Sequence, residues 1–129
     1  MAVLAKRYDA VEVRAAAGRI RKTRLHCGHF ITRRALAYFC EEFEIKGDSA
    51  AARHLAPFFT SNRIDTYDEP RADSIRKALA DARRRCSEDP ILDEIARNQA
   101  ARWRKQHPEQ DFAQALRGMR RHWKIQSPF

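Results

Sequence analysis

Residues 68–86 read DEPRADSIRKALADARRRC. Apolar side chains recur in this stretch every three or four positions, at Ile75, Leu79, Ala82 and Cys86. That period places them on one face of an α-helix. Asp68 is a suitable N-cap, and Pro70 suits the first helical turn. The stretch therefore predicts an amphipathic helix with one buried face.

Opposite charges in the same stretch support this helix. Asp73 precedes Lys77 by four residues, and Asp81 precedes Arg85 by four. Side chains at this spacing are neighbours on a helix surface, where an acid before a base is stabilising. We therefore expect both pairs on the exposed side of the helix.

The rest of the chain has the same helical character. Only four Gly interrupt it, β-branched residues are few, and no run alternates over a strand length. We expect further helices over residues 3–24, from Thr32 to just before Gly47 after a break at Gly28, from Asp48 or Ser49 to Ala56, from Asp89-Pro90, and from Pro108. The predicted fold class is all-α, a compact bundle of five or six short-to-medium helices.

Apolar stripes on these helices define the expected core. Its members are Leu36, Phe39, Cys40, Phe43, Leu92, Ile95, Ala96, Trp103, Phe112, Leu116, Met119 and Trp123, with Phe58 and Phe59 following Pro57. The two Trp continue stripes at helical spacing, so we expect core roles for both. The alternative is that a Trp beside Arg stacks on an unpaired base.

The length of 129 residues suits one domain, residues 1–129. Hydrophobic residues make up 43% of the chain, enough to form a core. Turn-forming residues concentrate in 60–69, which we expect to be a loop or a linker at which the domain could divide.

Positive charge is the main functional signal. The chain has 26 Lys and Arg against 17 Asp and Glu, a net charge of +9, and Arg outnumbers Lys by 20 to 6. Guanidinium groups bind phosphate oxygens bidentately and stack on bases, so the bias suits nucleic-acid contact. A GC-rich genome would also enrich Arg, but it would not explain the net charge.

Basic residues also cluster along the chain. Residues 13–40 contain seven Arg or Lys and no acid, and no acidic side chain follows Asp111. Arg7, Arg14 and Arg21 recur every seven residues and form a stripe on the first expected helix. The cluster at 83–85 ends a helix, where basic side chains also suit the helix dipole.

We therefore interpret the protein as a non-catalytic, nucleic-acid-binding helical protein that contacts the phosphate backbone of DNA or RNA. The expected contact residues are Arg7, Arg14, Arg21, Lys22, Arg24, Arg33, Arg34, Arg53, Arg83, Arg84, Arg102, Arg104, Lys105, Arg117, Arg120, Arg121 and Lys124. Clusters spread along the chain favour a long contact by a small subunit of a larger nucleoprotein complex. In size and charge the chain is similar to the small helical subunits of CRISPR effector complexes, a similarity of class without a shared motif.

A helix-turn-helix regulator is one alternative. Residues 40–45 resemble the end of the first motif helix, and residues 49–55 resemble a recognition helix. Arg53 and His54 would then approach bases, while Arg33 and Arg34 would hold phosphates. The second alternative is an inhibitor or adaptor that docks its basic face on an acidic protein.

Other classes of function lack a sequence signature. There is no phosphate-binding Gly-rich loop, no nucleophile elbow and no His-Glu-x-x-His motif, so we expect no enzyme, cofactor or small-molecule substrate. His26, Cys27, His29 and Cys40 match no closed zinc spacing, so we expect no metal. No run is long or apolar enough for a signal peptide or a membrane span, and three irregularly spaced Cys favour a cytoplasmic protein.

Overall fold

The computed structural model describes residues 27–59, 69–125 and 128–129. This part of the chain is all-α and contains no strand. Its elements are α2 (Cys27–Glu41), α3 (Asp48–Leu55), the 3-10 turn η1 (Ala56–Phe58), α4 (Glu69–Glu88), α5 (Pro90–Gln106) and α6 (Phe112–Trp123). The bundle predicted from the sequence is confirmed. The helix expected over 3–24 and the loop expected over 60–69 lie outside the described residues, except for Glu69, which starts α4.

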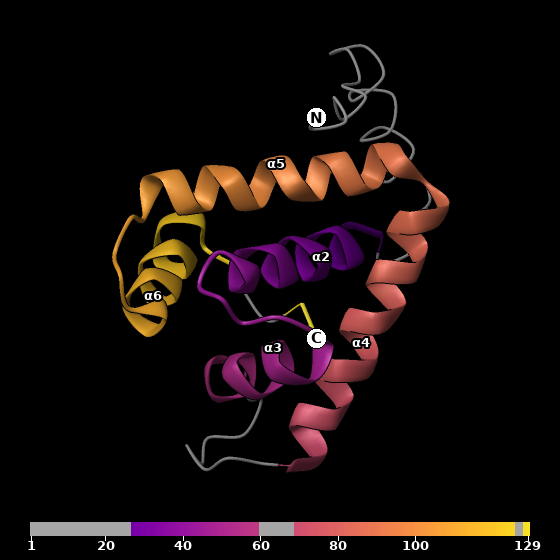
Figure 1. Ribbon diagram of the computed structural model, residues 1–129, viewed down its shortest axis with the longest axis horizontal. Coiled ribbons are helices and arrows are strands. Elements are labelled where there is room, and N and C mark those ends of the chain that lie inside the picture. The colour runs from indigo at the N-terminus through magenta and orange to yellow at the C-terminus, as the bar shows by residue number, and fades with distance from the viewer. Residues whose placement is uncertain (1–26, 60–68, 126–127) are drawn as a thin grey trace.

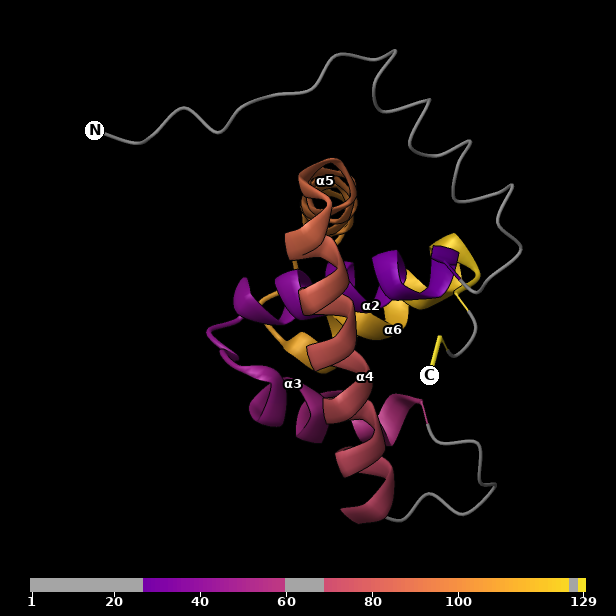
Figure 2. The same cartoon turned by 90° about the vertical axis from the view of Figure 1, so that its right-hand side faces the viewer.

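The helices are stacked in layers. Figures 1 and 2 show α5 in one outer layer, α2 in the middle with α6 near its end, and α3 in the other outer layer. Helix α4 runs along one edge and crosses all three layers. Accordingly α2 packs chiefly against α5 and α4, and α3 packs against α4.

Helix α2 is the centre of the core. All six residues from Ala35 to Cys40 are buried, so apolar side chains surround the helix at this point, as expected for a helix enclosed on several sides. Leu36, Phe39 and Cys40 are fully buried, which confirms the predicted face. The larger core combines these residues with Ile75, Leu79 and Leu116, so segments on both sides of residues 60–68 contribute to it.

Helices α4 and α5 form as predicted. Helix α4 buries Ile75, Leu79, Ala82 and Cys86. Both predicted pairs are present on its surface: Lys77 Nζ is 3.2 Å from Asp73 Oδ2, and Arg85 Nε is 2.9 Å from Asp81 Oδ2. At the start of α5, the Asp89 side chain accepts a hydrogen bond from Ile91 N, and Pro90 occupies the first turn.

Both expected ends of the second helix are wrong. Helix α2 ends at Glu41 and not just before Gly47, and the chain turns at Glu44, whose φ is 62°. The chain is already helical at Cys27, so Gly28 does not break the helix and Thr32 is not its N-cap. A helical Gly costs only about 1 kcal/mol relative to Ala, which the packing of α2 against two helices can outweigh. At the end of α3, Ala56 keeps helical angles (φ −52°, ψ −44°) despite the following Pro57, and the chain continues into η1.

The last helix begins later than predicted. Pro108 lies in a connection, and α6 starts at Phe112, where the Asp111 side chain accepts a hydrogen bond from Ala113 N. Arg104 Nη1 donates to the carbonyls of His107 (2.9 Å) and Glu109 (3.0 Å), which holds this connection in a non-helical path. A local contact from the last turn of α5 therefore accompanies the later start of α6.

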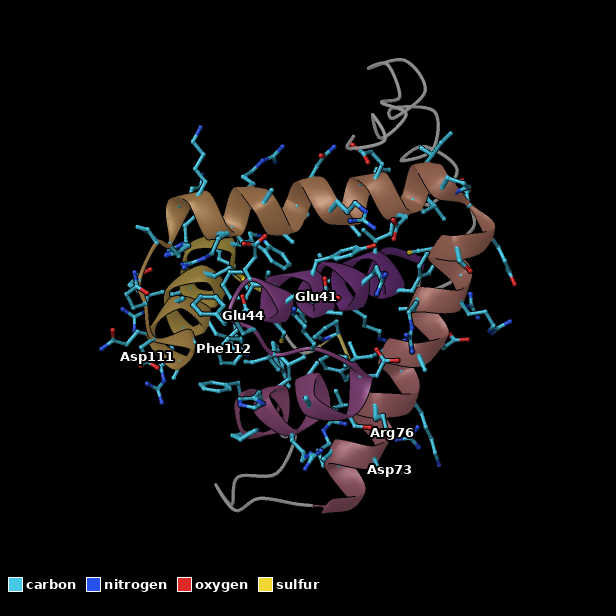
Figure 3. The ribbon with its side chains drawn as sticks, viewed as in Figure 1. Glu41, Glu44, Asp73, Arg76, Asp111 and Phe112 are labelled. Atoms are coloured by element: carbon cyan, nitrogen blue, oxygen red, sulfur yellow. The ribbon has the colours of Figure 1, made fainter. Side chains whose placement is uncertain are left out.

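Two contacts dock α6 on the bundle. The ring of Phe112 lies 5.4 Å from the ring of Phe43 and 6.3 Å from that of Phe58, between α6 and the α2–α3 region (Figure 3). Gly118 allows His107 to approach, because a Cβ at Gly118 would lie 2.9 Å from His107 Nδ1. Leu116 and Met119 are buried as predicted, whereas Phe112 and Trp123 are half-buried.

None of the described helices combines the length and apolarity that crossing a lipid bilayer requires.

Truncation of a central α2 side chain should destabilise the whole bundle. Leu36 is fully buried, so Leu36→Ala removes its burial and leaves a cavity. We expect the free energy of unfolding to fall by about 2–5 kcal/mol in urea titrations. Ala50→Gly on the half-buried side of α3 should cost only about 1 kcal/mol. A loss no larger than that of the α3 variant would contradict the central position of α2.

Candidate nucleic-acid interface

Ion pairs neutralise most basic side chains of α4 and the first half of α5. The pairs are Arg76–Asp73, Lys77–Asp73, Arg84–Asp81, Arg84–Glu88, Arg85–Asp81, Arg83–Asp48, Arg34–Asp93 and Arg97–Asp93. Figure 3 shows one of them, Asp73 beside Arg76 on α4. Arg83 and Arg84, which the sequence analysis expected at a nucleic acid, are thus paired with acids of this chain.

Arg34, also expected at the interface, is committed to a polar junction between α2 and α5. Its side chain is 14% exposed, and its Nε lies 3.3 Å from Asp93 Oδ1. The Tyr38 hydroxyl donates to the same oxygen at 2.6 Å, while Arg97 Nε donates to Oδ2 at 3.0 Å. Guanidinium carbons of Arg34 and Arg97 lie 4.1 and 4.4 Å from the centroid of the Tyr38 ring. The junction links the two helices through one carboxylate.

The junction also shifts proton affinities. Burial and the hydrogen bond to Asp93 raise the pKa of Tyr38 to about 12, so its hydroxyl stays protonated and donates. Burial acts to raise the pKa of Asp93, but hydrogen bonds from Tyr38, Arg97 and Arg34 outweigh it and lower that pKa. Asp93 therefore remains an anion between two cations.

Arg33 has a structural contact as well. Its Nε donates to the carbonyl of Pro128 at 2.5 Å, and its guanidinium lies 5.8 Å from the ring of Phe129. That ring packs 5.4 Å from Phe59. Burial lowers the pKa of Arg33. Arg33 thus fastens residues 128–129 against the core.

The end of α5 and the whole of α6 keep their positive charge. The basic residues in this region are Arg102, Arg104, Lys105, Arg117, Arg120, Arg121 and Lys124. Among the residues that the structure describes, none of these seven forms an ion pair with a carboxylate. Arg104 and Arg120 instead bind backbone carbonyls, which leaves their charge in place. Basic side chains without an ion-paired carboxylate among the described residues are therefore gathered at the end of α5 and along α6, where Glu44 and Asp111 also lie (Figure 3).

Three of these arginines share a flank of α6. Arg117 lies three residues before Arg120 and four before Arg121, and Arg117 and Arg120 both contact Phe58 of η1. Arg120 Nη1 donates to the Phe58 carbonyl at 2.5 Å, and its guanidinium lies 4.3 Å from the Phe59 ring. Burial lowers the pKa of Arg120. Arg120 therefore anchors the flank, while Arg117 and Arg121 are exposed.

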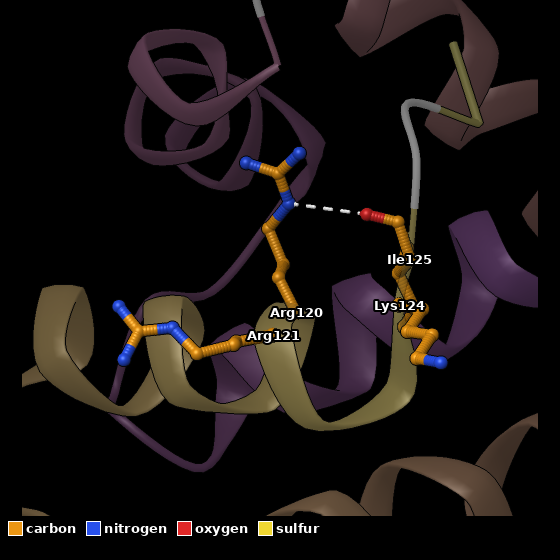
Figure 4. A pocket seen from close by; sticks show the side chains of 4 residues that line it. All are labelled: Arg120, Arg121, Lys124 and Ile125. Carbon is orange, nitrogen blue, oxygen red and sulfur yellow. Dashed lines mark hydrogen bonds between the residues drawn. The ribbon is translucent and has the colours of Figure 1, made fainter.

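A shallow hollow opens beside this anchor. It has a volume of about 380 Å³ and is lined by Arg120, Arg121, Lys124 and Ile125. Figure 4 shows these side chains around it, with the hydrogen bond from Arg120 Nε to the Ile125 carbonyl (3.4 Å). Its lining holds three cations and no carboxylate, a combination that suits an anion.

The backbone at Lys124 has an unusual conformation. Lys124 ends α6 with left-handed angles (φ 52°, ψ 42°), a position where Gly is preferred. The amides of Lys124 and Ile125 both donate to the carbonyl of Arg120, and Ile125 packs against the core. This cap holds the Lys124 ammonium at the rim of the hollow.

The geometry does not fit the helix-turn-helix alternative well. Six residues separate the end of α2 at Glu41 from the start of α3 at Asp48, whereas that motif has a turn of three or four. Arg53 is exposed and donates to the Ser49 carbonyl at 3.4 Å. The His54 ring lies 5.9 Å from the Phe112 ring of α6, at nearly a right angle to it, so it already has a partner within the chain.

Arg7, Arg14, Arg21, Lys22 and Arg24 lie outside the described residues, so the stripe expected on the first helix stays a prediction.

Comparison with known proteins adds no functional information. No family model, curated protein or solved structure matches this chain. Within the described ranges, no group of three or more His, Cys, Asp or Glu is arranged to hold a metal ion. We therefore infer function from the described surface of the protein.

Sequence reasoning could not separate structural arginines from free ones. Arg33, Arg34, Arg83 and Arg84 are expected at the nucleic acid together with the α6 residues, because all of them form similar clusters of basic residues in the sequence. The αL conformation of Lys124 was also missed, although an Ile two residues after the last helical position is a usable signal for this cap.

The Asp93 junction should make stability depend on pH. The folded pKa of Asp93 is below the unfolded value of about 3.9, so its contribution is complete above that pH and is lost as pH falls through the folded pKa. Asp93→Asn should lower the free energy of unfolding at pH 7, and the difference from wild type should shrink as the pH falls below about 4. Urea titrations at several pH values measure this, with Asp73→Asn on the exposed face of α4 as the smaller control. A difference that stays constant with pH would contradict the ionised junction.

The left-handed conformation of Lys124 should lower the stability of the protein. Lys124→Gly removes the steric cost of the left-handed residue, which outweighs the extra chain entropy of Gly, so we expect a gain of roughly 0.5–1 kcal/mol in unfolding free energy. Glu44→Gly is a matched control, because Glu44 (φ 62°) occupies a similar position after α2 and carries the opposite charge. Both variants should be more stable in urea titrations. Destabilisation of Lys124→Gly alone would show that its side chain supports the fold.

Proposed function

We propose that the protein binds nucleic acid through the phosphate backbone, without catalysis, and that the contact is centred on the α6 surface. This surface comprises Arg102, Lys105, Arg117, Arg121 and Lys124. The observation that carries the proposal is the separation of charge: acids neutralise α4 and the first half of α5, but not the α6 surface.

Several features of the α6 surface support phosphate binding. Its cations are exposed, so the loss of hydration on contact with a phosphate is small. Arginine provides a planar fork that matches phosphate oxygens. The hollow lined by Arg120, Arg121 and Lys124, of about 380 Å³, has room for a phosphate group. Contacts of this kind position a strand without reading its sequence.

The arrangement also narrows the earlier interpretation. The proposed contact lies at one end of the described bundle and not along both halves of the chain. Arg33, Arg34 and Arg120 are assigned structural roles, because they bind oxygen atoms of this chain. A binder of this size with one charged end suits a small subunit that bridges a strand to other proteins of a nucleoprotein complex. An acidic protein partner is the outcome to consider if nucleic acid does not bind.

Charge removal on the α6 surface should weaken binding. Arg117→Gln with Arg121→Gln removes two charges, so affinity for fluorescent 20-nucleotide strands should fall roughly tenfold or more at low salt, and the slope of log K against log salt should fall by about 1–2. Anisotropy titrations of single- and double-stranded DNA and RNA across salt concentrations measure both quantities.

The matched control removes the same charge from α4. Lys77→Gln with Arg84→Gln alters exposed cations that are already paired with acids, so affinity should change little. Circular dichroism establishes that both double variants are folded. Equal losses from the two pairs would show that net charge, and not the α6 surface, governs binding. No binding of any strand at low salt would overturn the proposal.

A further inference from the structure

The two tryptophans occupy different environments. Trp103 is 1% exposed in the core, which confirms its predicted role. Trp123, the last residue of α6, is only half-buried at the edge of that core. A large aromatic ring that remains accessible next to unneutralised cations is a candidate surface for stacking.

The Trp123 ring is held in a defined orientation. Its Nε1 donates to Gln106 Oε1 of α5 at 3.0 Å, and the His122 ring lies 5.4 Å away at an angle of 66°. The hydrogen bond satisfies the polar atom of the indole and fixes the plane of the ring. A ring that is oriented before binding loses little conformational entropy when a ligand stacks on it.

The guanidinium group of Arg102 lies over the Trp123 ring without close contact. The Arg102 guanidinium carbon lies 5.9 Å from the centroid of the Trp123 ring. Arg34, Arg97, Arg104 and Arg120 lie much closer to their aromatic partners, at 4.1, 4.4, 4.2 and 4.3 Å. Those four are in stacking contact. Arg102, like Arg33, Arg85 and Arg117 at 5.8, 5.6 and 5.3 Å from their rings, leaves a wider space. A planar base between two groups needs about 3.4 Å on each side, or about 6.8 Å in all. Arg102, which is exposed, needs to move by about 1 Å.

We infer that Trp123 and Arg102 form a stacking site for one unpaired base of a single-stranded nucleic acid. This inference rests on the proposed function and specifies its ligand. The base lies between the indole and the guanidinium. Lys124 follows Trp123 in the chain, and Lys105 precedes Gln106, which binds the indole, so both lysines are suited to the neighbouring phosphates. A base inside a duplex has both faces covered by its neighbours, so the site selects single strands.

Single-stranded DNA and single-stranded RNA share this chemistry. The site offers stacking and cations but contains no feature among the described residues that reads the 2′-hydroxyl. We therefore expect similar occupancy by both kinds of strand, and a test needs both as separate probes.

The experiment uses the intact chain and its own fluorescence. Unlabelled 12-nucleotide single strands of DNA and RNA, the corresponding duplexes, and a DNA strand of equal length with abasic sites are titrated at low salt. Stacking on Trp123 quenches its emission, whereas buried Trp103 supplies an unquenched background. The abasic strand has the same phosphates without bases, so it separates stacking from charge in the unaltered protein.

The expected results are specific. Single strands of both types should quench and should bind at least fivefold more tightly than duplexes or the abasic strand. Trp123→Leu should lose roughly fivefold to hundredfold of single-strand affinity, in line with base–aromatic stacking, whereas Trp123→Phe should retain most of it. Arg102→Gln, on the exposed side of α5, should reduce the quenching without altering the fold.

Other outcomes distinguish the two proposals. Salt-dependent binding with equal affinity for intact and abasic strands, or without quenching, would overturn the stacking site and leave phosphate binding by the α6 surface in place. An absence of binding by every probe would overturn both. Quenching by one strand type alone would contradict recognition by stacking, because bases of both strands have the same aromatic faces.

Discussion

The enclosure of α2 is the constraint on which the described structure depends. Its residues Ala35–Cys40 are buried against α4 and α5, so neither neighbour can move without exposing apolar surface. The Asp93 junction secures the same packing at its polar edge, where one carboxylate joins Arg34 and Tyr38 of α2 to Arg97 of α5. Because removal of one partner would leave the others buried without compensation, the junction also fixes the register of the two helices.

Arginine has two roles in this protein. Arg33, Arg34 and Arg120 are partly buried and bind carbonyl or carboxylate oxygens of the chain itself, often above an aromatic ring. Arg117 and Arg121 are exposed on the same helix as Arg120 and lack an acidic partner among the described residues. The structural arginines hold helices and chain ends in place, and the exposed arginines provide the positive charge of the α6 surface. The same side chain thus stabilises the fold and, a single turn away, provides charge for a ligand.

The end of α6 connects packing to the proposed function. Phe112 docks the start of the helix, and Arg120 binds η1 near its end, so the last turn is rigidly placed. The left-handed cap then turns the chain, brings Ile125 back to the core and leaves Lys124 outside. Trp123 stays at the boundary between core and solvent. Phosphate contacts and base stacking would therefore come from adjacent residues on one fixed helix end.

The sequence by itself determined the helical class and most buried faces, because the period of apolar residues is a local property. It correctly identified the face of α4 from Ile75 to Cys86, the N-cap of α5 at Asp89, and the burial of Trp103. Only the tertiary structure decided where α6 begins, since Phe112, its first residue, packs against Phe43 and Phe58 from distant parts of the chain. Only the tertiary structure also separated the arginine clusters, because the acids that neutralise Arg34 and Arg83 lie 59 and 35 residues away in the chain. Charge patterns in a sequence show how many cations exist, whereas folding decides which of them keep their charge available.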